Sequence, residues 1–313
     1  MLNLNQVRVF YHVAKNLSFT SAAKELLISQ PAVTAQVKAF GEYCDLNLFK
    51  KRGRGIRMTD EGRTIFNYIR PIFEQEKEVE NVIEDLRALK RGVLRLGTSK
   101  SYARYIMPGL VRKFHEKYCH IEIHLDEGSS AAMIKSICDL KNEVALIAKV
   151  IEEPDVEFIP FSEEELIPLF PPDHPLAQRE VVTFEEIAQQ PIIMKEVGSV
   201  TRKLVDDLFK RHDRSPRILM ETSNAEFIMQ VVERGDGISF LVKGSVVAEL
   251  EQKKLVTRPI LGESMTLGVN IAYLKNQPLS PSAKAFLAIL EQLIAEKGPI
   301  RGIQSLISKE RIS

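Results

Sequence analysis

The sequence predicts a multi-domain α+β chain in which a winged helix-turn-helix, a long linker helix and an α/β body follow one another. Three observations predict this order. Residues 1–65 carry a formal charge of +5, whereas the remaining residues carry −4. Apolar residues recur at heptad spacing between residues 60 and 90, and strand-like and helical segments alternate from Val93 onward. The length of 313 residues fits about two compact domains of roughly 150 residues each.

The composition is that of an ordinary globular protein, with 44% apolar and 27% charged residues. No run of ~18 apolar residues suggests a membrane span. The N-terminus lacks the basic and apolar segments of a signal peptide, so we expect a cytoplasmic protein without a membrane partner. Cys44, Cys119 and Cys138 have no metal-ligand spacing, which favours three reduced thiols that are buried or semi-buried and leaves a redox switch or a metal site as alternatives.

Two helices are expected at the start of this basic head. Residues 4–15 place apolar side chains at helical spacing. Ser18 is a suitable N-cap for the next segment, in which Ala22 and Ala23 contribute to a compact apolar face. Side chains as small as alanine allow a following helix to cross closely.

A third helix is expected to begin after Ser29, with Pro31 in its first turn, where a missing N–H does no harm. Val33, Val37 and Phe40 form its buried stripe. The opposite face carries short polar side chains and one cation, a composition suited to reading base edges in a major groove. The residues of this face are Gln30, Ala32, Thr34, Ala35, Gln36 and Lys38.

A basic segment follows this helix. Between Phe49 and Thr59, five cations surround two glycines, which predicts a short β-wing whose arginines reach phosphates or a minor groove. The alternative is a solvated surface loop. Its place directly after a helix-turn-helix pattern favours the wing.

Residues 18–62 resemble the DNA-binding domain of the LysR family of bacterial transcription regulators almost position for position. The resemblance implies that the exposed side of the third helix faces double-stranded DNA and that two arginines lie on the wing. Together with the helix pattern, it gives as DNA-binding residues Ser29, Gln30, Pro31, Thr34, Gln36, Lys38, Arg52 and Arg54.

Three positions depart from the family pattern. Ala35 stands where the family usually has arginine, and Gly41 replaces a usual glutamate. Asp45 occupies a turn position that is normally glycine. Because a glycine inside a helix costs roughly 1 kcal/mol, we expect the end of this helix to be loose or kinked.

The linker helix, residues 60–90, carries an apolar seam at spacings of four and three residues. Glu76 is its single polar position. Because a free helix would expose this stripe, we expect it to pair with a second copy of the chain, with packing against its own domains as the alternative. Resemblance to the LysR family implies a homodimer built this way, and a homotetramer of two dimers. The seam consists of Ile65, Ile69, Ile72, Glu76, Val79, Ile83 and Leu86.

The body alternates strands with helices, which predicts parallel or mixed α/β sheets. Strands are expected at, among others, Val93–Gly97, Glu157–Ile159 and Leu166–Phe170. Helices are expected at about 103–118, 130–140, 199–211, 224–234, 243–250 and 281–297.

Four strand-to-helix junctions share hydroxyl or amide side chains beside free helix N–H groups. They begin at Gly97, Glu127, Gly198 and Thr222. Ligands of open α/β sheets bind at the carboxyl ends of strands, and helix N-termini favour anions. Each junction taken singly is more simply a helix cap, but the four together are better explained if some of them face one pocket.

The resemblance extends more weakly over nearly the whole chain. It implies two α/β subdomains of the periplasmic-binding-protein type, joined by two crossover strands, with a small-molecule effector between them. The domains are then 1–59 for DNA binding, 60–90 for the linker and 91–313 for the effector. The first subdomain would take about 91–161 and 268–313, and the second about 162–267.

The candidate effector contacts combine the four junctions with the resemblance. They are Thr98, Ser99, Lys100, Ser129, Ser199, Thr201 and Ser223. Lys100, Lys149 and Lys195 lie at strand ends, and Arg202 lies in the first turn of a helix. Their positive charge favours an anionic effector, such as a carboxylate or another oxyanion.

No pattern indicates catalysis, a cofactor or a metal. His174 has no nucleophile at a supporting spacing, and Gly235–Gly237 is too short for a nucleotide-binding fingerprint. His115, Cys119 and His120 fit no tetrahedral ligand set. The sequence therefore predicts an effector-controlled, sequence-specific DNA-binding regulator that is not an enzyme, with RNA polymerase as a further candidate partner. The alternatives are an α/β binding protein or enzyme with an incidental basic head, and a regulator that senses redox state through its cysteines.

Overall fold

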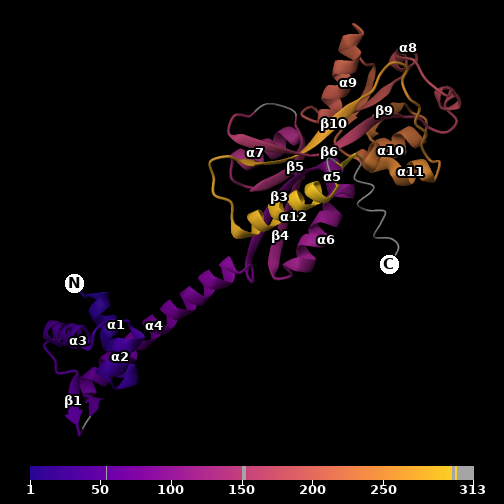
Figure 1. Cartoon of the computed structure of the whole chain (residues 1–313). Helices are drawn as coiled ribbons and strands as arrows, with labels where there is room; N and C mark the ends of the chain where they lie inside the picture. The colour runs from indigo at the N-terminus through magenta and orange to yellow at the C-terminus, as the bar shows by residue number, and fades with distance from the viewer. Residues whose placement is uncertain (54, 150–152, 298–299, 302–313) are drawn as a thin grey trace. The chain divides into compact units, whose positions relative to one another are not determined.

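The computed structural model describes residues 1–53, 55–149, 153–297 and 300–301. The chain divides into two compact units, Met1–Arg87 and Ala88–Ser313, which we call the head and the body (Figure 1). Each unit has apolar cores of its own. Across the described residues, we find no helix with both the length and the apolar character needed to cross a bilayer.

The head contains the predicted helices and wing. Its elements are α1 (Leu4–Asn16), α2 (Phe19–Glu25), α3 (Gln30–Cys44), the antiparallel pair β1 (Phe49–Arg52) and β2 (Gly55–Met58), and α4 (Asp60–Arg87). The two predicted N-caps are confirmed. The hydroxyl of Ser18 accepts a hydrogen bond from Ser21 N at 3.1 Å, and that of Ser29 accepts one from Ala32 N at 3.3 Å.

Aromatic side chains form the centre of the head. The ring of Phe10 lies 5.3 Å from that of Phe40 and 5.4 Å from that of Phe49, which ties α1 to α3 and to the wing. Gly62, in the first turn of α4, lies so close to the segment just before β1 that a β-carbon there would overlap the carbonyl oxygen of Leu48.

The end of α3 is regular, so the expectation of a loose or kinked helix end was wrong. The helix continues through Gly41 to Cys44. A β-carbon at Gly41 would lie 3.1 Å from the carbonyl oxygen of Leu46, so glycine suits the close approach of the chain that follows. Asp45 closes the helix in the left-handed region, with φ 53°, which aspartate tolerates better than most residues.

The apolar seam of the linker helix α4 divides into two parts. Ile69 is buried in the core of the head, and Ile65 packs against that core. Glu76, the polar seam position, receives a hydrogen bond from Arg8 of α1 at 2.6 Å, which ties α4 to α1. The remaining seam positions are exposed on the single chain, and they are Ile72, Val79, Ile83 and Leu86.

The body is built on strands whose order is β4-β3-β5-β10-β6-β9-β7-β8. We call the sheet from β4 to β10 and its helices the first lobe, and the sheet from β9 to β8 and its helices the second lobe. The long strand β6 (Val156–Leu169) belongs to both, pairing first with β10 and then with β9. The other strands are β3 (Gly92–Ser99), β4 (Ile121–Gly128), β5 (Val144–Ala148), β7 (Ile192–Lys195), β8 (Ile218–Thr222), β9 (Ile238–Val242), β10 (Thr266–Leu274) and β11 (Ile300–Arg301), which pairs with β6.

Helices cover both faces of each lobe. Because successive side chains of a strand point to opposite faces, each buried strand contributes residues to the cores on both sides. In β5, Ala145 and Ile147 face a core that includes α7, whereas Val144 and Leu146 face the core that includes α12. In the second lobe, Ile193 packs with α10, and its neighbours Ile192 and Met194 lie in the core that includes α9. The helical elements are α5 (Lys100–Tyr105), α6 (Met107–Lys117), α7 (Ser130–Cys138), η1 (Pro175–Gln178), α8 (Phe184–Ala188), α9 (Val200–Arg211), α10 (Ala225–Glu233), η2 (Lys243–Val246), α11 (Val247–Glu251) and α12 (Pro281–Lys297).

Three predicted elements in the body were wrong. The helix expected at about 243–250 is the 3-10 helix η2 followed by the short helix α11. The helix expected over 103–118 is two helices, α5 and α6, and α6 begins with Pro108 in its first turn. The strands expected at 157–159 and 166–170 are both part of β6, which continues through Pro160. A shift in register opposite Val269 and Asn270 accommodates this proline, because proline in a sheet is tolerated at bulges.

Candidate nucleic-acid interface and ligand pocket

The polar face of α3 is open to solvent. Its buried stripe, Val33, Val37 and Phe40, packs into the head, which leaves the other side of the helix outward. Gln30 Nε2 donates to Thr34 Oγ1 at 3.2 Å, so these two side chains are ordered one turn apart. The exposed residues of the predicted set on this helix and its cap are Ser29, Gln30, Pro31, Thr34, Gln36 and Lys38.

The wing follows α3 in the sequence and is described less completely. Arg52 is the last residue of β1 and pairs in register with Gly55. Gly53, with φ 59°, makes the left-handed turn between the strands. The other predicted wing residue, Arg54, lies outside the described residues.

A cluster of charged and polar side chains joins α1 to α2. The Glu25 carboxylate accepts hydrogen bonds from Lys15 Nζ at 2.8 Å and from Asn16 Nδ2 at 2.6 Å, and it lies 3.2 Å from His12 Nδ1. These contacts, with Lys15 first, lower the pKa of Glu25 from 4.5 to about 2. The cluster holds α2 against α1, and α2 is the helix that α3 crosses.

In the body, a cavity of about 20 Å³ lies between the carboxyl ends of strands from both lobes. That is room for about one water molecule. Five predicted contacts line it, from three of the four junctions that the sequence singles out: Ser99, Lys100, Ser129, Ser199 and Thr201. Gly198 brings the lobes together here, because a β-carbon on it would lie 3.3 Å from Ser129 Oγ.

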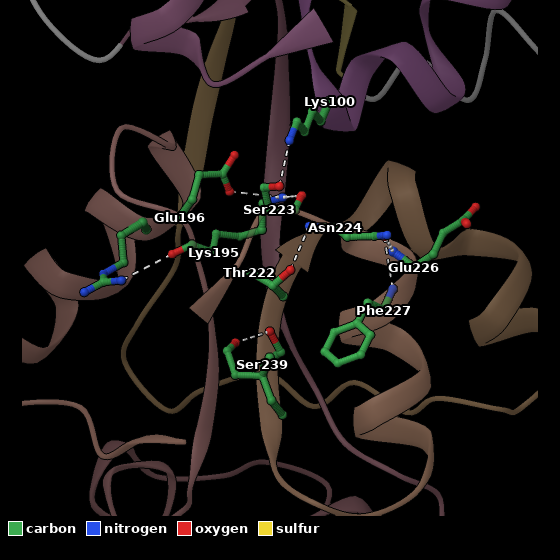
Figure 2. A network of polar contacts seen from close by, with 11 residues as sticks. Lys100, Lys195, Glu196, Thr222, Ser223, Asn224, Glu226, Phe227 and Ser239 are labelled. Atoms are coloured by element: carbon green, nitrogen blue, oxygen red, sulfur yellow. Dashed lines mark hydrogen bonds and ion pairs between the residues drawn. The ribbon is translucent and has the colours of Figure 1, made fainter. Parts of the chain in front are cut away.

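Two predicted contacts do not line the cavity. Thr98 is fully buried, and its hydroxyl donates to the carbonyl oxygen of Leu146 at 3.1 Å, which is a structural bond inside the first lobe. Ser223 instead lies between two lysines (Figure 2). Lys100 Nζ donates to Ser223 Oγ at 2.6 Å, and Lys195 Nζ donates to Ser223 O at 2.5 Å.

Lys195 is the buried charge of this site. Its ammonium group lies 3.3 Å from the Glu196 carboxylate, as Figure 2 shows. Burial lowers the pKa of Lys195; the Glu196 carboxylate opposes this shift, and the charge of Lys100 adds to it. Sequence reasoning noted Lys195 only as a strand-end cation and missed Glu196, although a carboxylate directly after a buried strand was a usable signal.

The polar side chains of the junctions divide into two kinds. Ser129 caps α7 by accepting from Ala132 N at 3.2 Å, and Asn224 caps α10 by accepting from Glu226 N at 2.9 Å. Ser99 and Ser199 occupy N-cap positions but make no side-chain cap hydrogen bond. The capping explanation therefore accounts for two junctions and leaves the hydroxyls of Ser99 and Ser199 for the cavity that they line.

The other predicted cations are engaged elsewhere. Arg202 donates to Asp206 at 2.8 Å and to Glu221 at 2.6 Å. Lys149 lies over the ring of Phe158, 5.0 Å from its centre. Neither residue lines the cavity, so the positive charge of the pocket comes from Lys100 and Lys195.

The three cysteines are free thiols, and Cys44 is partly buried, as expected. Cys119 and Cys138 are exposed, so the expectation of buried or semi-buried thiols was wrong for these two. Partial desolvation of the Cys138 thiol, followed by the nearby Glu153 and Asp139, raises the pKa of Cys138, which disfavours the reactive thiolate. Among the described residues, no group of histidine, cysteine and acidic side chains could hold a metal ion.

Two family models match the chain. The model of the "LysR substrate binding domain" matches residues 87–295, and that of "Bacterial regulatory helix-turn-helix protein, lysR family" matches residues 4–63. The RuBisCO operon transcriptional regulator of Allochromatium vinosum is 32% identical over 285 residues, which cover 91% of this chain and 94% of that protein.

Two solved structures are similar in fold. A full-length OxyR variant from Pseudomonas aeruginosa has a TM-score of 0.74 at 20% identity and covers 94% of this chain and 100% of that chain. The regulatory domain of CcmR from Synechocystis PCC6803, in complex with 2-PG, has a TM-score of 0.61 at 28% identity and covers 65% of this chain and 97% of that chain.

Proposed function

Because the chain belongs to the LysR family of bacterial helix-turn-helix regulators, we propose that α3 and the wing bind DNA, that α4 joins two copies of the chain and that the cavity in the body receives the effector. The chain is a DNA-binding transcriptional regulator with a small-molecule effector domain. The observation that carries the residue-level proposal is the exposed polar face of α3, held outward by a fully packed apolar stripe.

The recognition helix α3 enters a major groove. Gln30, Thr34 and Gln36 meet base edges, because short amide and hydroxyl side chains are suited to this contact. Three residues lie toward the sugar-phosphate backbone of the DNA: Ser29, Pro31 and the single cation Lys38. Arg52 and Arg54 of the wing bind phosphates, which fixes the orientation of the head on the duplex.

The wing arginines give this proposal a quantitative test. In fluorescence anisotropy of the full chain on promoter DNA, Arg52→Ala and Arg54→Ala should each weaken binding and reduce the salt dependence of the logarithm of affinity by about 1. Arg112→Ala removes an exposed arginine from the body and is the control. An unchanged salt dependence in both wing variants would contradict the proposed wing contacts.

Two copies of the chain pair through α4. The exposed seam positions Ile72, Val79, Ile83 and Leu86 support this, because an apolar stripe of this kind is stabilised by a second helix. Pairing places two heads on one duplex, and two such dimers form the proposed tetramer. In sedimentation at dilute concentration, Ile83→Lys should dissociate the pair, whereas Glu84→Lys, an exposed position outside the seam, should leave it intact.

The effector is an anion held in the cavity between the lobes. Two lysine ammonium groups and one carboxylate, Glu196, are the charges of its lining. Ser99, Ser129, Ser199 and Thr201 supply hydroxyls beside them. The CcmR regulatory domain, in complex with 2-PG, supports a small-molecule ligand in this domain.

The wider assignment follows from these roles. The DNA-binding domain takes 1–59, the linker 60–90 and the effector domain 91–313, with the subdomains divided near 161 and 267. The chain performs no catalysis of its own. It acts on promoters, with RNA polymerase as a partner. It works in the cytoplasm, because the chromosome lies there.

A further inference from the structure

We infer that the hydroxyl of Ser223 competes with the anionic effector for Lys100, so that effector binding breaks a tie between the two lobes. The inference rests on the proposed anion pocket and adds a mechanism by which the occupied pocket changes the body. It reverses the role that the sequence suggests for Ser223, which becomes the group displaced rather than a group that contacts the ligand.

Ser223 supplies both lysines with an oxygen. Its hydroxyl oxygen accepts a hydrogen bond from Lys100 of the first lobe at 2.6 Å, and its carbonyl oxygen accepts one from Lys195 of the second lobe at 2.5 Å. In Figure 2 the two ammonium groups approach Ser223 from different elements. A carboxylate or phosphate oxygen offers the same acceptor with a full negative charge, and charge-assisted hydrogen bonds are the stronger kind.

The cavity must widen before an oxyanion can enter it. Its volume of about 20 Å³ holds about one water molecule, so an oxyanion needs additional room. Lys195 is nearly fully buried and paired with Glu196, which fixes it in place. Lys100 is half-buried on a flexible stem, and Ser223 lies in the loop after β8, whose pairing is with β7. The hydrogen bond between Lys100 and Ser223 is therefore the one that breaks when the anion binds.

The same short helix carries a second tie. Arg104 lies four residues after Lys100 on α5, and therefore on the same face. Its guanidinium donates to Glu249 of α11 at 2.9 Å and approaches Sδ of Met229 in α10 at 3.9 Å. Arg104 also lies 3.8 Å from the carboxylate of Glu226 in α10. Loss of the Lys100 tie therefore leaves α10 joined to α5 through Arg104, and the loop before α10 is the segment that can shift.

Isothermal titration of the full chain with inorganic phosphate, and separately with acetate, tests the competition. Ser223→Ala removes the hydroxyl acceptor and should tighten phosphate binding about tenfold, because a hydrogen bond from a charged donor no longer has to be broken. Lys100→Met should weaken binding at least as much. Ser239→Ala removes a hydroxyl that donates to Ile193 O at 2.6 Å in the same lobe, and it should leave the affinity within about twofold.

The outcomes separate the possibilities. Equal affinity in the wild type and Ser223→Ala would overturn the competition, and weaker binding in Ser223→Ala would make Ser223 a direct ligand contact. Failure of both anions to bind any form would overturn the inference as well. Tightening with phosphate alone identifies a phosphate-type anion, and tightening with both identifies a general oxyanion site.

Hydrogen exchange reports the broken tie directly. The amides of Glu226 and Phe227 are held by the Asn224 side chain at 2.9 and 3.1 Å, directly after Ser223. Saturating phosphate should raise their exchange rates several-fold in the wild type and have little effect in Ser223→Ala, where the tie is already absent. Protection of these amides by phosphate would contradict the inference. Both measurements are made without DNA, so a chain that failed to bind promoters would disprove the proposed regulator function but would not by itself decide this result.

Discussion

The head and the body present their functional side chains in opposite ways. On α3, the helix that we propose reads DNA, the polar residues point into solvent, and the Lys38 side chain is 77% exposed. In the pocket of the body, the Lys195 side chain is 3% exposed and already bonded to Ser223 and Glu196. The head offers groups that need only exchange water for DNA, whereas the body offers groups that a ligand must take from internal partners.

This difference explains why ligand binding in the body can act as a signal. Replacing water on an exposed side chain leaves the fold of the head unchanged. Replacing an internal partner such as Ser223 breaks a contact between elements of the two lobes, and the protein must rearrange. A ligand shifts a conformational equilibrium only through such differential contacts.

The same substitution in the two regions tests the comparison most strongly. Lys195→Met should destabilise the body by about 3 kcal/mol, because it leaves the Glu196 carboxylate in a largely buried site without its cation. Lys38→Met removes an exposed pair with Glu42 and should change stability by less than about 0.5 kcal/mol. Urea denaturation of the full chain, with hydrogen exchange to locate the change, measures both. Similar losses in the two variants would contradict the contrast between the regions.

A negative charge on α3 should strongly weaken DNA binding without changing the fold of the head. Thr34→Glu puts a carboxylate on the exposed face that we propose meets DNA, and binding to promoter DNA should fall about 100-fold. The circular dichroism spectrum and melting temperature should stay the same. Gln75→Glu adds the same charge at an exposed position of α4 and is the control. Equal loss in both variants would show a general charge effect instead.

Substitutions at two glycines compare the packing of the head with that of the body. Gly62→Ala should destabilise the head by about 2 kcal/mol, because the new methyl group meets the Leu48 carbonyl. Gly109→Ala lies in α6, where no heavy atom is within 4 Å of the new β-carbon, and it should stabilise the helix by about 0.5–1 kcal/mol. Thermal unfolding measures both effects. A neutral Gly62→Ala would show that α4 does not pack tightly against the chain at Leu48.

The smallest effect concerns acid stability of the head. The pKa of Glu25 is lowered from 4.5 to about 2, so its stabilisation is full above pH 4.5 and disappears as the pH falls toward 2. Glu25→Gln should cost under about 1 kcal/mol at neutral pH, because the site is partly exposed. The difference from the wild type should vanish across that pH window, as followed by denaturation at each pH. Glu78→Gln on α4 serves as the control, and a difference that grows toward low pH would contradict the assigned contacts.

The sequence predicts the head more completely than the body, and the reason is physical. In the head, local signals decide the structure: Ser18 and Ser29 cap their helices, and Val33, Val37 and Phe40 alternate with an outward polar face. Such signals lie within a few residues of one another. The regular end of α3 escaped prediction, because the demand for glycine at position 41 comes from the later chain at Leu46.

In the body, the junctions that face the pocket could be predicted, but their pairing could not. Ser99, Ser129 and Thr201 line the cavity because strand ends from two lobes converge. Which hydroxyls are used internally depends on contacts over long sequence separation, such as Thr98 with Leu146 and Lys100 with Ser223. The continuity of β6 through Pro160 likewise depends on a bulge against β10, which no local pattern reveals.

The most direct test of the account is a footprint of the full chain on the DNA upstream of its own gene, at low ionic strength. The account predicts a discrete protected site with two-fold symmetry, because paired α4 helices present two copies of α3 to one duplex. It also predicts that Thr34→Glu removes the protection. Uniform coverage of the fragment, or no protection at any concentration, would contradict the assignment of α3 as the DNA-reading helix.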